Sequence, residues 1–206
     1  MAGLTTARST PGSLTLVTLS GTLVRLEPLT LGAVPELWAV AQDPVLWRWT
    51  LADIRSQDDL QAYVAEALAA QAQGTALPFV TRLQADGRAV GSTRYANIDL
   101  THRRLEIGWT WLGREWQRSG VNRECKFLLL EHAFEVLGCG RVEFKTDALN
   151  AQSRRALAGI GAVEEGTMRS HQITASGRVR DSVYFSIIAA EWPAVKQRLS
   201  MRAAER

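Results

Sequence analysis

Residues 116–122, Trp116-Gln117-Arg118-Ser119-Gly120-Val121-Asn122, stand between an apolar strand pattern and an apolar helix pattern. A loop at such a junction directs several backbone N–H groups toward one point. The N-terminus of the helix that follows adds the positive end of its dipole. We therefore predict that residues 116–122 form a binding site for a phosphate or pyrophosphate group.

A second stretch runs from Leu149 to Leu157 and reads LNAQSRRAL. It places the carboxamide of Asn150 and the hydroxyl of Ser153 three residues apart, where Asn150 or Ala151 begins a predicted helix. Side chains at that spacing lie on one face of a helix. The two polar groups are therefore expected to lie side by side, just after the end of the predicted strand 141–147.

Apolar periodicity predicts a single α/β domain with a mixed sheet and the element order β-α-α-β-β-β-α-β-α-β-β-α. The expected strands are 21–29, 77–83, 88–98, 103–112, 141–147, 163–173 and 179–189. The expected helices are 31–42 with Thr30 as N-cap, 57–73, 121–137, 151–159 and 191–201. In strand 103–112, strict alternation assigns one face to Leu105, Ile107, Trp109 and Trp111 and the other to Glu106, Gly108, Thr110 and Leu112.

Composition narrows the class of protein. The chain has 206 residues, 46% of them hydrophobic and 22% charged, which is ordinary for one globular domain. No apolar run approaches the ~20 residues that span a bilayer. The net charge of +3 is spread along the chain, so no specific nucleic-acid binding is predicted. We expect a cytoplasmic protein with a domain at 21–202, and with 1–20 as a flexible leader or an edge strand.

Two cysteines, Cys125 and Cys139, lie in and just after one predicted helix, which favours free thiols over a disulfide. Neither has a Cys or His neighbour at metal-ligand spacing, so no metal site is predicted. Trp47 and Trp49 follow the first predicted helix. They are candidates for an aromatic acceptor pocket, and equally for core residues.

The two stretches resemble the two cofactor-binding signatures of the GNAT acetyltransferase superfamily, and the resemblance extends over roughly 21–200. Residues Gln117–Asn122 match its loop pattern Gln/Arg-x-x-Gly-x-Gly/Ala, with Asn122 in place of the last small residue. The segment Val121–Glu135 and the pattern Leu149–Leu157 are similar to the branch of Rim-type ribosomal-protein N-terminal acetyltransferases.

The resemblance implies a GNAT-like fold with helices on both faces of a mixed central sheet. Strands 103–112 and 141–147 would be parallel and would splay apart. The pantetheine arm of acetyl-CoA would bind unpaired main-chain groups in the gap between them. The implied cofactor-binding residues are Thr110, Trp111, Leu112, Gln117, Arg118, Ser119, Gly120, Val121, Asn122, Asn150 and Ser153.

The resemblance also implies acetyl transfer from acetyl-CoA to a primary amine by direct attack. Glu106 is the candidate general base, acting through water. Equally, it is a structural carboxylate paired with an arginine such as Arg94. Leu157 occupies the position where many family members have a tyrosine acid, and Ser153 is the nearest substitute. Tyr184 is a more distant candidate.

Several alternatives stay open at this stage. The acceptor is either a protein N-terminus or a small amine, since the sequence does not define the shape of the 43–56 and 170–181 loops. A non-catalytic acyl-CoA-binding regulatory module would carry the same cofactor signatures. A homodimer is an expectation by analogy with the family.

Overall fold

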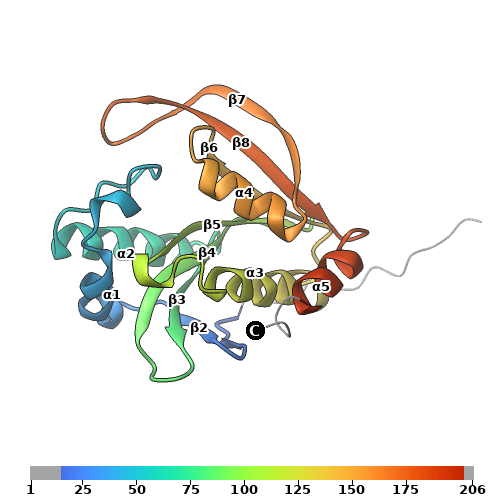
Figure 1. Cartoon of the computed structure of the whole chain (residues 1–206), viewed down its shortest axis with the longest axis horizontal. Coiled ribbons are helices and arrows are strands. Elements are labelled where there is room, and N and C mark those ends of the chain that lie inside the picture. The colour runs from blue at the N-terminus through green and yellow to red at the C-terminus, as the bar shows by residue number, and fades with distance from the viewer. Residues whose placement is uncertain (1–14, 202–206) are drawn as a thin grey trace, which may run out of the picture.

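The computed structural model describes residues 15–201, and within them the chain forms one eight-stranded sheet in the order β1-β2-β3-β4-β5-β6-β8-β7 (Figure 1). The first 14 residues, which include most of the expected leader, lie outside the described residues. The strands are β1 (Leu19–Ser20), β2 (Val24–Pro28), β3 (Leu77–Leu83), β4 (Ala89–Asp99), β5 (Arg104–Leu112), β6 (Arg141–Asp147), β7 (Val163–Ile173) and β8 (Val179–Ile188).

The helices are α1 (Val34–Ala41), α2 (Gln57–Ala72), α3 (Val121–Glu131), α4 (Ala151–Ile160) and α5 (Trp192–Met201). A π-helical segment (His132–Val136) extends α3, and 3-10 turns occur at Leu31–Ala33, Pro44–Leu46 and Arg114–Trp116. Within residues 15–201, no helix combines the length and the apolar character needed to cross a membrane.

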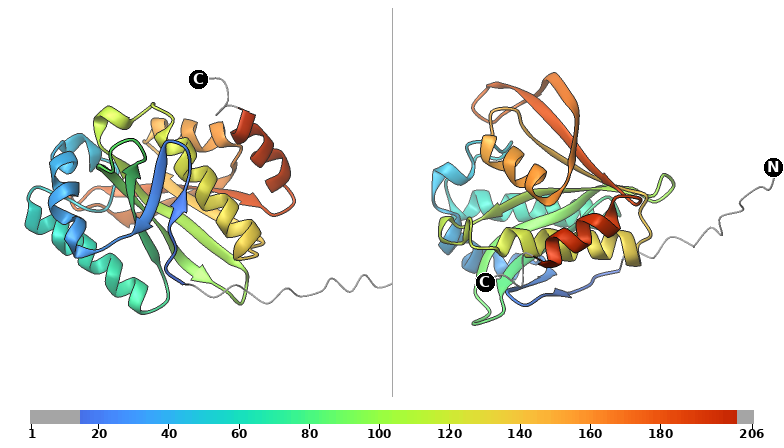
Figure 2. Two further views of the ribbon diagram at one scale, coloured as in Figure 1. Left: turned by 90° about the horizontal axis from the view of Figure 1, so that it is seen from below. Right: turned by 45° about the vertical axis from the view of Figure 1, so that its right-hand side comes forward.

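Helices cover both faces of the sheet, as predicted (Figure 2). Neighbouring residues of a strand point to opposite faces. Accordingly, Val80 packs in a core cluster with α1 and α2, whereas Phe79 packs in a second cluster with α3, α4 and α5. We call these two sides the α2 face and the α3 face.

Strands β5 and β6 separate after a short parallel contact. They pair at Arg104↔Arg141, Leu105↔Val142 and Glu106↔Glu143, yet β5 continues to Leu112 and β6 to Asp147. The predicted splay between two parallel strands is therefore confirmed. It leaves main-chain groups of both strands without a sheet partner on the facing side.

One prediction about β5 is wrong, because the strand contains a bulge. Ser92 pairs with Trp111 but Arg94 pairs with Gly108, so β5 has one extra residue there, and Trp109 has φ of 49°. The bulge exchanges the faces beyond it. Leu112 joins Leu105 and Ile107 in the cluster on the α3 face, and Thr110 contacts α3. Trp111 joins the cluster on the α2 face.

The predicted cap of the first helix is also wrong. Thr30 accepts no side-chain hydrogen bond, and a 3-10 turn precedes α1, which begins at Val34 with Pro35 in its first turn. The helix signal at residues 56–59 is confirmed. Ser56 Oγ accepts from Asp59 N at 3.1 Å and the Asp59 carboxylate accepts from Ser56 N at 2.9 Å, which is a complete capping box.

Glu124 of α3 holds the turn between β1 and β2. Its carboxylate accepts hydrogen bonds from the backbone N–H groups of Thr22 at 2.9 Å, Leu23 at 2.7 Å and Val24 at 2.7 Å. A Cβ on Gly21 would lie 2.6 Å from its carboxyl carbon, so glycine permits this close approach. Glu124, which belongs to the Val121–Glu135 signature, therefore has a structural role in this chain.

We expect Glu124→Ala to lower the free energy of unfolding by about 2 kcal/mol, because three charge-assisted hydrogen bonds are lost and water replaces only part of them. Urea denaturation measures the change. Glu131→Ala is the matched control on the same helix, since Glu131 forms only a surface pair with Lys196 and should change stability by less than about 0.5 kcal/mol. Equal effects of the two substitutions would contradict this role of Glu124.

Candidate functional site

The loop between β5 and α3 presents a row of free backbone donors. Arg118 (φ 63°) and Gly120 (φ 95°) adopt left-handed conformations, which turn the chain sharply into the helix. Within residues 15–201, no acceptor takes the N–H groups of residues 118–123, and no side chain caps α3. Unpaired N–H groups at a helix N-terminus form an anion site.

Side chains of the same loop hold it in place. Ser119 Oγ donates to Trp116 O at 2.6 Å. Gln117 Nε2 donates to Leu112 O at 3.1 Å, and its Oε1 accepts from Gln152 Nε2 of α4 at 3.2 Å. The two sequence signatures are thus in direct contact. Asn122 Oδ1 is buried and has no hydrogen-bond partner among the described residues.

At the start of α4, Asn150 forms a hydrogen bond within the helix, whereas the prediction for this residue was a contact with the cofactor. Asn150 Oδ1 accepts from Ser153 N at 3.0 Å, so it is the N-cap of α4. Ser153 is half-buried, and Leu157, one turn further along, is buried with 6% of its surface exposed. Leu157 has no proton to donate.

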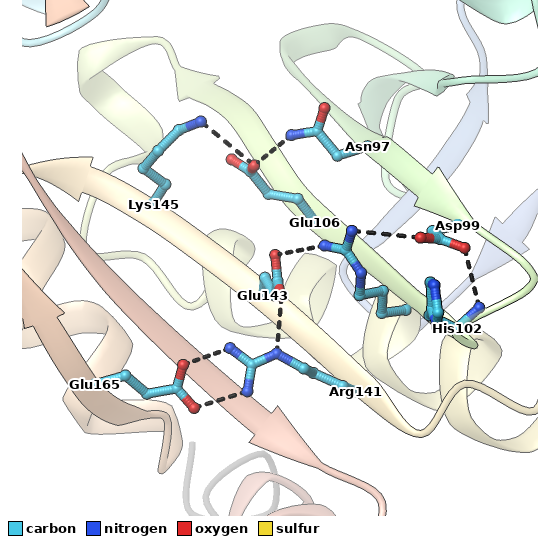
Figure 3. A network of polar contacts seen from close by, with 9 residues as sticks. Asn97, Asp99, His102, Glu106, Arg141, Glu143, Lys145 and Glu165 are labelled. Carbon is cyan, nitrogen blue, oxygen red and sulfur yellow. Dashed lines mark hydrogen bonds and ion pairs between the residues drawn. The ribbon is translucent and has the colours of Figure 1, made fainter. Parts of the chain in front are cut away.

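Glu106 is buried on the α2 face, with only 3% of its surface exposed. Its Oε2 accepts from Asn97 Nδ2 at 2.8 Å and lies 3.5 Å from Lys145 Nζ (Figure 3). Asn97 reaches it from a bulge in β4, where its φ is 48°. The expected alternative partner, Arg94, does not pair with Glu106: its guanidinium lies 5.0 Å from the ring of Tyr63 and 4.9 Å from that of Trp109.

Sequence reasoning missed Asn97 and Lys145. Lys145 had a usable signal, because it alternates with the buried Phe144 and so falls on the face opposite that residue. No sequence pattern indicated the contact between Asn97 and Glu106, because it depends on the bulge in β4.

A cavity of about 720 Å³ adjoins Glu106 where β5 and β6 are still paired. Three carboxylates and one arginine belong to its polar lining, which consists of Asn97, Asp99, Thr101, Arg104, Glu106, Glu143 and Tyr184. Glu143 pairs in turn with Arg104 at 3.5 Å and with Arg141 at 2.8 Å, and Figure 3 shows this network continuing to Glu165. The hydrogen bonds from Arg141 and Ser186 lower the pKa of Glu165 to about 2. Each carboxylate of the cavity is thus paired with a basic side chain: Asp99 and Glu143 with arginines and Glu106 with Lys145.

The two tryptophans after α1 have different positions. Trp47 belongs to the core, with 5% exposed and its ring 5.1 Å from that of Trp111. Trp49 is half-buried, and the guanidinium of Arg178 lies 5.6 Å from its ring. The 43–56 loop therefore meets the β7–β8 hairpin, although the two are far apart in the sequence.

A splayed parallel strand pair beside an uncapped helix N-terminus, with a buried carboxylate on the opposite face, is the arrangement expected of a GNAT-like fold. The family model described as "Acetyltransferase (GNAT) domain" matches residues 24–163. The chain therefore belongs to the GNAT acetyltransferase family.

Individual relatives agree with this assignment. "Putative ribosomal N-acetyltransferase YdaF" of Bacillus subtilis (strain 168) is 32% identical over 111 residues, which are 54% of this chain and 60% of that protein. The chain thus matches about three fifths of this curated relative. A GCN5-related N-acetyltransferase from Brucella melitensis superposes with a TM-score of 0.86 at 28% identity, over 94% of this chain and 89% of that one.

Mycobacterium smegmatis RimJ, solved in complex with CoA-disulfide, has the same fold. Its TM-score is 0.77 at 24% identity, with 91% of this chain and 94% of that chain covered.

Proposed function

We propose that this chain transfers the acetyl group of acetyl-CoA to the α-amine of a protein N-terminus. The observation that carries the proposal is the gap between β5 and β6, which opens toward the uncapped N-terminus of α3. A single ligand that carries both a thioester arm and a pyrophosphate would fill the gap and the helix N-terminus together. The structure of RimJ with CoA-disulfide supports the choice of ligand.

The residues present fit such a ligand. The free N–H groups of residues 118–123 match the charge of a pyrophosphate. The main chain of Thr110, Trp111 and Leu112 lies on the β5 edge that β6 leaves unpaired. Ser153 and the buried Oδ1 of Asn122 would form hydrogen bonds with polar groups of the pantetheine or the nucleotide.

Glu106 is the proposed general base. It lies at the last paired position of β5, on the α2 face, whereas α3 and its anion site lie on the other face. An acceptor approaching from the cavity side would pass Glu106 before it meets a thioester in the gap. Loss of a proton to Glu106, directly or through water, would make the amine a nucleophile.

A protein N-terminus is proposed over a small amine for two reasons. The cavity beside Glu106 has a volume of about 720 Å³, which leaves room for residues that follow an N-terminal amine. The relative YdaF is described as a putative ribosomal N-acetyltransferase, which also supports a protein acceptor.

The test combines binding and turnover. Acetyl-CoA at about 100–1,000 times its dissociation constant should raise stability by about 3–4 kcal/mol, measured as a thermal shift. Release of CoA is then followed on N-terminal peptides beside a panel of small amines. Turnover confined to small amines would contradict the proposed acceptor. A thermal shift without any turnover would indicate the non-catalytic acyl-CoA-binding module instead.

A further inference from the structure

Lys126 of α3 is a buried lysine at the place where β5 and β6 separate. Only 6% of its surface is exposed. Its Nζ donates to Thr110 Oγ1 of β5 at 2.8 Å and lies 5.8 Å from the ring centre of Phe144 on β6. Both residues stand beyond their strands' last paired position, Glu106↔Glu143. The ammonium therefore lies between the diverging strands, on the α3 face.

This ammonium has no anionic partner. The chain has three lysines, and the other two form ion pairs: Lys145 with Glu106, and Lys196 with Glu131 and Glu135. Within residues 15–201, Lys126 forms none, and its one hydrogen-bond acceptor is a hydroxyl. A buried charge without a partner is unfavourable for stability. An anion that reaches the site during function would supply the missing partner.

The electrostatic surroundings favour a group that exchanges a proton near neutral pH. Burial lowers the pKa of Lys126 to about 8, while the Glu106 carboxylate acts in the opposite direction. Burial also raises the pKa of Cys125 to about 12, so its thiol is neutral and supplies no counter-charge. Lys126 is therefore mostly an ammonium at pH 7 and can release a proton to a nearby thiolate.

Acetyl transfer from a thioester produces one anion inside the site, the thiolate of CoA. If pantetheine lies along Thr110–Leu112, as proposed above, its sulfur reaches the narrow end of the gap, where the Lys126 ammonium stands. Leu157 occupies the position of the family's tyrosine and donates no proton, and Tyr184 lines the cavity beside Glu106.

We propose that the Lys126 ammonium is the general acid that protonates the departing CoA thiolate. The amine nitrogen, whose first proton has passed through Glu106 to solvent, forms a bond to the carbonyl carbon and gives its second proton to Glu106, while the carbon–sulfur bond breaks. The sulfur takes a proton from Nζ and leaves as the CoA thiol. The proton on Glu106 then returns through solvent to the neutral Nζ, which restores both groups. This inference rests on the proposed acetyl transfer.

The test uses Lys126→Met, which keeps the length and buried character of the side chain but removes its proton. We expect kcat to fall by about 10–1,000-fold, as for loss of a general acid, with little change in the KM for acetyl-CoA. The wild-type rate should decline above about pH 8. Lys126→Arg keeps the positive charge, but a guanidinium does not release its proton, so its kcat should fall as in Lys126→Met. Lys196→Met is the surface control.

Two readouts do not depend on turnover. The thiol of CoA bound to the wild type should have a pKa below that of free CoA in the same buffer, because the Lys126 ammonium stabilises the thiolate. The ultraviolet absorbance of the thiolate follows this titration. Lys126→Met should abolish this shift without weakening the binding of desulfo-CoA. It should also raise the melting temperature, because an unpaired buried charge is removed.

The results separate this inference from the proposed function. Unchanged activity of Lys126→Met, or a bound CoA thiol with the same pKa in both proteins, would overturn the role of Lys126 while wild-type turnover still supports acetyl transfer. A melting temperature lowered by Lys126→Met, with activity retained, would assign the lysine to holding Thr110. Failure of the wild type to bind either CoA or acetyl-CoA would contradict both proposals.

Discussion

Glu106→Gln should lower kcat/KM for the amine acceptor by about 100–1,000-fold, the range expected when a general base is lost. Glutamine has nearly the same shape and still accepts the hydrogen bond from Asn97 at this buried position. Its amide cannot take a proton from the acceptor ammonium. Because the substitution is on the face opposite α3, the affinity for acetyl-CoA should stay within about twofold. Steady-state kinetics with isothermal titration of acetyl-CoA measures both quantities.

Glu143→Gln is the matched control for Glu106→Gln. Glu143 is the residue paired with Glu106 in the register of β5 and β6, and it lines the same cavity. It differs in its partners, because two arginines, Arg104 and Arg141, hold it. We expect less than about a tenfold loss for this variant, through weaker acceptor binding. Retention of more than a third of the activity in Glu106→Gln would mean that Glu106 serves only to hold Asn97 and Lys145.

The elements of the fold were predictable because their signals are local. The capping box at Ser56 and Asp59, the apolar stripe of α3 and the alternation in β6 each depend on residues close together in the sequence. The splay was predictable only through the resemblance to a known family. Nothing in the residues of β5 or β6 alone indicates that they part after Glu106↔Glu143.

The bulge at Trp109 shows where local reasoning ends. A tryptophan with positive φ is contrary to backbone preference, so strict alternation was the natural prediction. Pairing with β4 and packing of Trp111 against Trp47 outweigh that preference. One extra residue transfers Thr110 to the α3 face, where it meets Lys126. The contact on which the Lys126 inference rests was therefore invisible to a periodicity argument.

For the candidate site, the course of the main chain could be predicted from the sequence better than the contacts of the side chains. The loop at 117–122 was predictable since glycine and a helix start define it locally. The contact of Asn97 with Glu106 was not, because it depends on the bulge in β4. Asn150 was singled out for a ligand, yet its carboxamide oxygen caps α4.

Gly91→Ala should be the most destabilising single methyl addition in the part of the chain that the structure describes. A Cβ at Gly91 would lie 2.1 Å from the carbonyl oxygen of Trp111 and 2.9 Å from the Cα of Leu112. Both atoms are backbone, so no side-chain rotation relieves the overlap. Strand β4 would have to move away from β5 at the pair Gly91↔Leu112, next to the bulge. We expect a loss of more than about 4 kcal/mol, the range reached by severe overpacking.

Gly159→Ala is the matched control, because nothing lies within 4 Å of its added methyl and the residue is inside α4. It should stabilise the protein by about 0.5–1 kcal/mol, since alanine loses less backbone entropy in a helix. The same substitution should therefore change the free energy of unfolding in opposite directions at the two positions, and urea denaturation measures both changes. If Gly91→Ala folds with wild-type stability, β4 and β5 are further apart than the structure has them. The main chain of Trp111 and Leu112 would then not be fixed at the edge where the pantetheine arm is proposed to bind.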